Sequence, residues 1–221
     1  MPATPNFGDA LLQIVALVFS VVFHEVSHGW VADRHGDPTA RMMGRLTLNP
    51  LPHLDLFGSI ILPALLFFGH SPFLFGYAKP VPVDPRNLRN PRADGIKVAI
   101  VGPFSNILLG LVLTILYAPV SLYLGDGHAL TRLLIYGIGI NAILAVFNLL
   151  PIPPLDGSWI LENTLRGSAY NVYRSIRPYG MFLILAIVFL PPVSAVLIGI
   201  PRAILLTGYQ FVATAIQGML T

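Results

Sequence analysis

His24-Glu25-Val26-Ser27-His28 lies near the end of a long apolar stretch, residues 9–31, and this placement decides how the chain is interpreted. Two histidines four positions apart share one face of a helix, so both imidazoles can reach one metal ion. The glutamate between them projects close to the same ion, where a carboxylate can take a proton from water. Because ionisable side chains are costly at membrane depth, they are rarely found there without a role. The stretch therefore predicts a metal site inside a membrane-spanning helix, with a base beside it.

The composition is that of an integral membrane protein. Of 221 residues, 55% are hydrophobic and 10% are charged, with a mean hydropathy of +0.74; an ordinary soluble domain has about a quarter charged residues. The chain has no cysteine, so any metal must be held by His, Asp or Glu. The basic residues form no dense run, so no nucleic-acid partner is expected. A cleaved signal peptide is not expected either, because the first apolar segment carries the histidine motif.

Apolar stretches along the chain predict an all-α polytopic membrane protein, a helical bundle of about five to six apolar segments. A spanning helix needs about 20 apolar residues, and residues 9–31, 95–120 and 131–151 meet this need. Residues 57–76 are apolar but broken by glycine and proline. Residues 179–219 are also interrupted by prolines, which leaves either two spans or one span with a broken helix.

One membrane-embedded domain is expected over residues 1–221, with its core at 9–160 and its C-terminal helices at 178–219. Within the loop after the first span, residues 43–48 alternate weakly in hydrophobicity, and residues 76–83 carry prolines as an edge strand can. These two segments could pair, or hold an extended substrate. An irregular surface loop is the alternative.

Two further motifs place polar groups next to the spans. Gly102-Pro103-Phe104-Ser105-Asn106 opens the second span, and Asn148-Leu149-Leu150-Pro151-Ile152-Pro153-Pro154-Leu155-Asp156-Gly157 ends the third. Catalytic zinc usually takes three protein ligands and leaves a fourth position for water, so the histidine pair needs one more ligand. Asp156 is the best candidate, because it follows a span where the helical backbone ends. Asn106 and Asn148 suit the binding of a peptide backbone or a developing oxyanion, or they join helices by hydrogen bonds.

Together the three motifs resemble those of the site-2 protease family of intramembrane zinc metalloproteases. HEVSH resembles its HExxH motif, GPFSN its GPxxN-type motif and NLLPIPPLDG its NxxPxPxLDG motif, in the family's order. The resemblance implies one zinc ion per chain, held by His24, His28 and Asp156, with Glu25 as general base. It also implies that the two asparagines of these motifs position substrate or stabilise the intermediate. Many members carry a PDZ or CBS domain, and this chain resembles a compact member without either.

The predicted function is that of an intramembrane zinc metalloendopeptidase, which hydrolyses peptide bonds within or near transmembrane segments of membrane-protein substrates. The expected partners are a transmembrane protein or peptide substrate and the lipid bilayer. A membrane metal-ion transporter and a catalytically silent metal-binding membrane protein are the alternatives. Replacement of Glu25 by Gln separates them, because transport tolerates the change better than hydrolysis does. Transport sites also usually lie between symmetric halves, and no inverted repeat is evident.

The motifs constrain the topology if they meet in space, because the span ends that carry them must then lie on one side of the membrane. The chain has to leave and return to that side between residues 31 and 95, and 20 residues are too few for two crossings. We therefore expect residues 57–76 to be re-entrant. Eleven of the 13 basic residues then fall on the active-site side, which the positive-inside rule makes cytoplasmic, with the N-terminus outside. The compact form suits a prokaryotic inner membrane.

Overall fold

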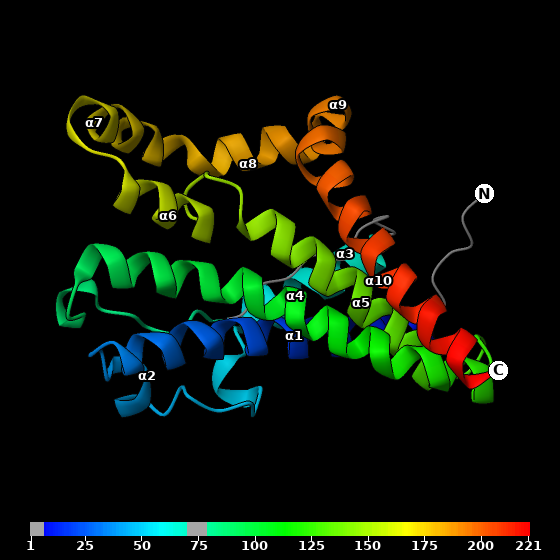
Figure 1. Cartoon of the computed structure of the whole chain (residues 1–221). Coiled ribbons are helices and arrows are strands. Elements are labelled where there is room, and N and C mark those ends of the chain that lie inside the picture. Colours follow the sequence, from blue (N-terminus) through cyan, green and yellow to red (C-terminus); the bar gives the residue numbers. More distant parts are fainter. Residues whose placement is uncertain (1–6, 70–78) are drawn as a thin grey trace.

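The computed structural model describes residues 7–69 and 79–221, and the described residues form an all-α bundle without strands. Its longest helices are α1 (Phe7–Arg34), α4 (Pro91–Leu124), α5 (Ala129–Asn148) and α10 (Ile200–Leu220), which lie along one another (Figure 1). The shorter α-helices are α2 (Thr39–Met42), α3 (Leu62–Phe68), α6 (Asp156–Thr164), α7 (Gly167–Ile176), α8 (Gly180–Phe189) and α9 (Pro191–Ser194).

Helix α4 is the centre of the bundle and packs against α1, α5, α6 and α10. Its sequence explains both ends: the Asn90 side chain accepts from the Ala93 N–H before Pro91, and Gly125 closes the helix at a φ of +75°. Close approach of the helices depends on small residues, as is usual in membranes. At Gly110, for example, the ring of Tyr209 from α10 occupies the space that a Cβ would need.

Within residues 7–69 and 79–221, five stretches are long and apolar enough to cross a membrane: Phe7–Arg34, Pro91–Leu124, Ala129–Asn148, Gly167–Phe189 and Pro191–Leu220. This agrees with the predicted all-α polytopic fold.

The last two stretches run in succession from one end of the bundle to the other (Figure 1). Helix α8 begins at Gly180, beside the Pro153 carbonyl at the end that carries α6. Helix α10 ends near Gln217, whose amide donates to Ser121 at the opposite end, 2.9 Å away. Both stretches are long and apolar enough to cross a membrane, and the chain between them is broken around α9.

The loop after α1 makes a closed excursion, as expected of a re-entrant segment. The Lys79 N–H donates to the His53 carbonyl over 2.8 Å, so the chain between them returns to its starting point. The described part consists of one π-helical turn, Leu56–Ile61, followed by α3, about 20 Å of helix in all at 1.5 Å per residue and too short to cross a bilayer. The suggested strand at residues 43–48 is irregular, and so are residues 79–83; residues 76–78 lie outside the described ranges.

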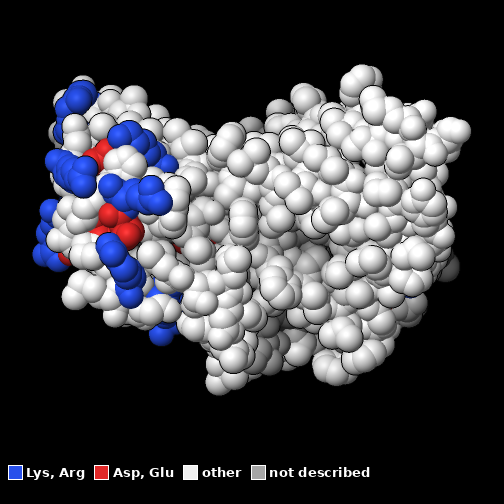
Figure 2. All heavy atoms as spheres, turned by 60° about the horizontal axis from the view of Figure 1, so that its bottom comes forward, with Lys and Arg blue, Asp and Glu red and all other residues white. Residues whose placement is uncertain are grey.

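Charged side chains gather at one end of the molecule, and the rest of the visible face carries almost none (Figure 2). The end with the charges is the one toward which α1 ends and α4 begins. The long uncharged face is the part that fits the hydrocarbon of a bilayer.

Candidate metal centre

Three predicted ligands from distant parts of the chain meet at one point. His24 and His28 lie one turn apart on α1, and Asp156 is the first residue of α6. The Nε2 atoms of the two histidines are 3.0 Å apart, and the Asp156 carboxylate oxygens lie 3.1 Å from His24 Nε2 and 3.4 Å from His28 Nε2. One donor atom from each residue fits within a 4.8 Å group. Among the described residues this is the only such group of three.

The tautomer of each imidazole follows from the contact that its Nδ1 atom makes. His24 Nδ1 lies 2.6 Å from the side-chain oxygen of Asn106, and His28 Nδ1 lies 2.6 Å from the Val98 carbonyl. Both partners are acceptors, so each Nδ1 carries a proton, and in the neutral form of each ring the Nε2 lone pair is free to bind a metal. Two nitrogen lone pairs and a carboxylate therefore point at one small volume, an arrangement that a cation stabilises.

The donor set fits zinc. The Asp156 Oδ2 atom is buried and has no hydrogen-bond partner among the described residues, as expected for an oxygen that faces lone pairs instead of N–H groups. Two imidazole nitrogens and one carboxylate oxygen match the three-ligand sets of catalytic zinc sites, which keep an open fourth position. The outer hydrogen bonds of both imidazoles match the partners that ligating histidines usually have.

Helix α4 approaches the two histidines at Gly102, the first residue of the Gly-Pro motif. A Cβ at this position would overlap the His28 ring and lie 2.7 Å from the ring of His24. The absence of a side chain therefore lets the backbone of α4 lie directly against both imidazoles. Because the Val98 carbonyl is one turn earlier on α4, the same close approach brings it to His28.

Comparison with known proteins agrees with this geometry. A match to Peptidase family M50 covers residues 12–123 and 118–191, which include all three motifs. The chain belongs to peptidase family M50, the site-2 protease family. It is thus a membrane zinc metalloprotease with Zn²⁺ as its cofactor, as the sequence motifs predict.

Three relatives are similar to this M50 peptidase over most of their length. "Putative zinc metalloprotease YwhC" of Bacillus subtilis is 35% identical over 187 residues, 82% of this chain and 81% of the relative. "Putative zinc metalloprotease Rip2" of Mycolicibacterium smegmatis is 28% identical over 85% of this chain and 70% of its own length. "Putative zinc metalloprotease MJ0611" of Methanocaldococcus jannaschii is 29% identical over 72% of this chain and 74% of its own. The comparison with solved structures gave no match.

Asn106 of this M50 peptidase lies behind His24 and is fully buried. Its side-chain oxygen faces His24, and its amide nitrogen donates to Asn141 over 2.7 Å and to the Ser20 carbonyl over 3.3 Å. Asn141 in turn donates to the Ser20 hydroxyl over 2.8 Å. These contacts leave Asn106 no amide hydrogen for a substrate, and they suit a residue that orients His24.

The network reaches residues that the sequence analysis missed. Ser20 and Asn141 are buried polar residues inside predicted spans, and Ser20 lies one helical turn before His24. That spacing puts both on one face of α1 and could have indicated a shared polar contact. Asn148, the other predicted asparagine, is half-buried, and its amide donates to the Leu144 carbonyl over 3.0 Å.

Glu25 meets a backbone donor from the segment that follows the re-entrant loop. The Val81 N–H donates to the Glu25 carboxylate over 2.7 Å. We call residues 79–84 the strap, because it crosses α1 at this point. Val81 also fills the space beside Gly29, one turn after Glu25, where a Cβ would lie 2.7 Å from the valine side chain. A backbone amide thus orients the predicted base, and a glycine admits the strap.

Buried Asp37 anchors the far end of the strap. Its carboxylate accepts from the Asp84 N–H over 2.7 Å, from Asn87 Nδ2 over 3.0 Å and from the Thr39 N–H over 3.1 Å, and also from the Thr39 hydroxyl. Burial alone would raise the pKa of Asp37, but these hydrogen bonds outweigh it and hold the pKa below its ordinary value. At neutral pH the strap is therefore held by an ionised carboxylate.

Proposed function

We propose that this protein hydrolyses peptide bonds within or near transmembrane segments of membrane-protein substrates. The observation that carries the proposal is the position of the metal centre along α1. The 28 residues of α1 extend about 42 Å at 1.5 Å per residue, more than the roughly 30 Å hydrocarbon core. His24 lies ten residues before Arg34, about 15 Å from the charged end of that helix. A hydrolytic centre at that depth acts on substrates that reach it inside the bilayer.

In this proposal His24, His28 and Asp156 hold the zinc ion, and Glu25 is the general base. Zinc supplies polarisation of the scissile carbonyl and a lowered pKa of water. The Glu25 carboxylate accepts the proton of the attacking water and passes it to the leaving amine. Glu25 is only half-buried, so a substrate can approach it from the side of the strap. Asn148 lies half-buried at the end of α5 and is our candidate for binding the substrate backbone.

The substrate must be extended at the cleaved bond, because a helix hides its carbonyls in hydrogen bonds. The strap is the described segment best placed to hold such a strand beside Glu25. Its prolines limit how it can do so: Pro80 and Pro82 have no N–H, and the Lys79 and Val81 N–H groups are engaged by His53 and Glu25. We expect the strap to accept hydrogen bonds from a substrate and to donate few.

The test of the proposed function is cleavage of a transmembrane reporter substrate by the reconstituted protein, wild type beside Glu25→Gln, with bound zinc measured in both. We expect equal zinc and cleavage only in wild type. Zinc in both without cleavage by either would favour a silent metal-binding protein. Transport of zinc into vesicles that survives Glu25→Gln would favour a transporter. Loss of zinc from Glu25→Gln would contradict the assignment of Glu25 as a base outside the ligand set.

We also propose that the charged end faces the cytoplasm of a prokaryotic cell, with the N-terminus outside, and that residues 1–221 act as one membrane-embedded domain. The support is the concentration of Lys and Arg at one end (Figure 2) and the positive-inside rule. The chain has no native cysteine, so single cysteines report without background. In intact cells, a membrane-impermeant maleimide should label Gly127→Cys between α4 and α5 and spare Arg174→Cys on α7. The reverse pattern would invert the topology.

A further inference from the structure

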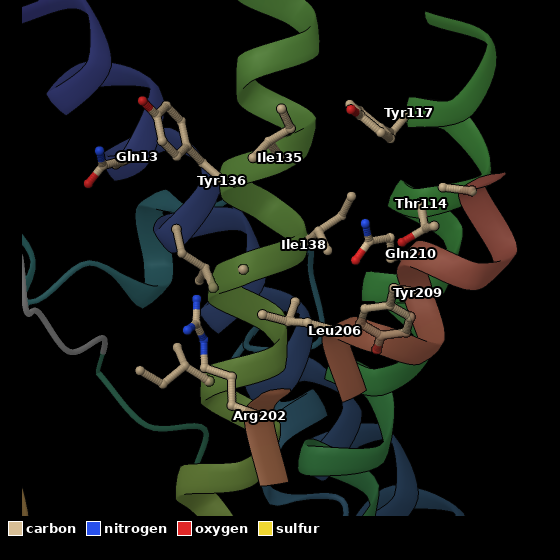
Figure 3. A pocket seen from close by; sticks show the side chains of 14 residues that line it. Gln13, Thr114, Tyr117, Ile135, Tyr136, Ile138, Arg202, Leu206, Tyr209 and Gln210 are labelled. Carbon is tan, nitrogen blue, oxygen red and sulfur yellow. The ribbon is translucent and has the colours of Figure 1, made fainter. Parts of the chain in front are cut away.

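A second polar feature lies away from the metal centre, in a cavity of about 570 Å³ between α5 and α10 (Figure 3). Residues of α1 and α4 complete its walls. Its floor on α5 runs from Ile135 to Ile143, and both of these side chains are 41% exposed. The cavity therefore opens on the surface that faces the lipid.

Arg202 of α10 brings a charge into this cavity at about the middle of the membrane. A Cβ built at Gly139 would lie 3.7 Å from a guanidinium nitrogen of Arg202. Gly139 is central in the 20-residue helix α5, so it lies about 15 Å from either helix end at 1.5 Å per residue. The side chain rises from there along α5 toward Tyr136 and Gln13 (Figure 3). Its charge thus points to the end of the bundle opposite the metal centre.

The Arg202 guanidinium has no anionic partner within the described part of the chain. Its Nε is buried without a hydrogen-bond partner, and no ion pair in residues 7–69 and 79–221 includes it. All ten acidic residues of the chain lie in those ranges, since residues 1–6 and 70–78 contain neither Asp nor Glu. By contrast, Arg132, the other basic residue of this half, pairs with Asp9. A guanidinium at this depth without a carboxylate from its own chain calls for an anion from elsewhere.

We propose that the cavity binds an anionic lipid, whose phosphate or carboxylate group pairs with Arg202 while an acyl chain lies against Ile138 and Leu206. A guanidinium binds both kinds of head group through two parallel N–H donors. The amide of Gln13 lines the same cavity. None of the residues that line the cavity is acidic. Donors at one end and aliphatic walls beyond them match a charged head with an apolar tail.

A lipid fits these observations better than an acidic residue of a protein partner. The cavity opens between Ile135 and Ile143 on the lipid-facing surface, so a lipid can enter it directly. The Arg202 side chain lies along a wall that also carries Gln13 and Tyr136, which places polar groups above its charge. Lipid is also present around the protein at all times.

The test uses zinc-loaded protein in a nonionic detergent after lipid depletion. Thermal unfolding and native mass spectrometry are measured with added phosphatidylglycerol, with phosphatidylcholine of the same chains, with inorganic phosphate and with a transmembrane peptide that carries a central Asp. We expect phosphatidylglycerol to raise the Tm of wild type and to be retained at one molecule per chain. Arg202→Gln should lower the apparent affinity by about tenfold or more, because the charged pair is lost. Gly139→Leu should also lower it, because it fills the cavity and keeps the charge.

Arg174→Gln removes the same charge from an exposed site on α7 and should behave as wild type. Without lipid, Arg202→Gln should be at least as stable as wild type, because an unpaired charge is removed. Arg202→Lys keeps a charge and should retain part of the lipid response. An equal phosphatidylglycerol effect in wild type and Arg202→Gln would overturn the proposal. So would a full effect of inorganic phosphate alone, or stabilisation only by a transmembrane peptide with a central Asp.

Discussion

Replacing Asn106 by Ala should weaken zinc binding about 10- to 100-fold, although Asn106 is not a ligand. The change leaves the His24 Nδ1–H, now 2.6 Å from the Asn106 oxygen, without an acceptor in a buried site. An unpaired buried donor costs about 1–3 kcal/mol. Loss of an outer partner of a ligating histidine typically costs about 10–100-fold in metal affinity, or about 1.4–2.8 kcal/mol. The two estimates agree, so the predicted loss does not depend on one of them.

The assay is competition for zinc between the metal-stripped protein and a chelator of known affinity. Asn141→Ala is the matched control, because it removes a partner of Asn106 and leaves the Asn106–His24 contact in place. It should lower the Tm and change the zinc Kd by less than about threefold. A wild-type Kd in Asn106→Ala would refute the orienting role of Asn106. Equal losses in the two variants would assign the effect to the whole polar network.

Three further predictions concern the backbone around the site. Gly102→Ala should lose zinc, as measured by metal analysis, because a Cβ at this position would overlap the histidine rings. The control Gly208→Ala should keep zinc, because a Cβ at this position on α10 would meet no other atom within 4 Å. Val81→Pro should lower kcat and retain zinc, since it removes the N–H that orients Glu25. Val81→Ala keeps this N–H and should leave kcat unchanged. Equal kcat values for the two variants would contradict the orienting role of the Val81 N–H. Asp37→Ala should lower the Tm at pH 7 and lose its effect as the pH falls below about 3.8, the ordinary pKa of Asp. The depressed pKa of folded Asp37 makes its contribution present at neutral pH and absent in acid. A Tm difference that is constant with pH would refute the ionised anchor.

The sequence was sufficient for the elements whose signals are local. A run of apolar residues predicts a span through its length alone, and the histidine pair four apart on α1 predicts one shared metal through helix geometry. Asp156 could be predicted as a third ligand, because a ligand was still required and the motif ended a span. The structure brings these groups within reach of one ion.

The contacts that could not be predicted depend on close packing between distant segments. Nothing local to Val98 marks its carbonyl as the partner of His28, because every helix has such carbonyls and only the approach at Gly102 selects this one. The Val81 contact with Glu25 depends on the path of the strap, which is fixed partly by Asp37. The sequence shows Arg202 only as a charged residue next to a proline. Its place in the cavity depends on the packing of α10 against α5.

The anchoring of both imidazoles on α4 has a thermodynamic consequence. The two histidines belong to α1, and the acceptors that set their tautomers, Asn106 and the Val98 carbonyl, belong to α4. Separation of the helix pair would release both rings, so the assembled site and the docked helices form one cooperative unit. Because zinc binds only the assembled site, its binding free energy stabilises the state in which α1 is docked on α4. Removal of the metal should therefore loosen this helix pair first, and hydrogen exchange should rise along α1 before it rises in α5.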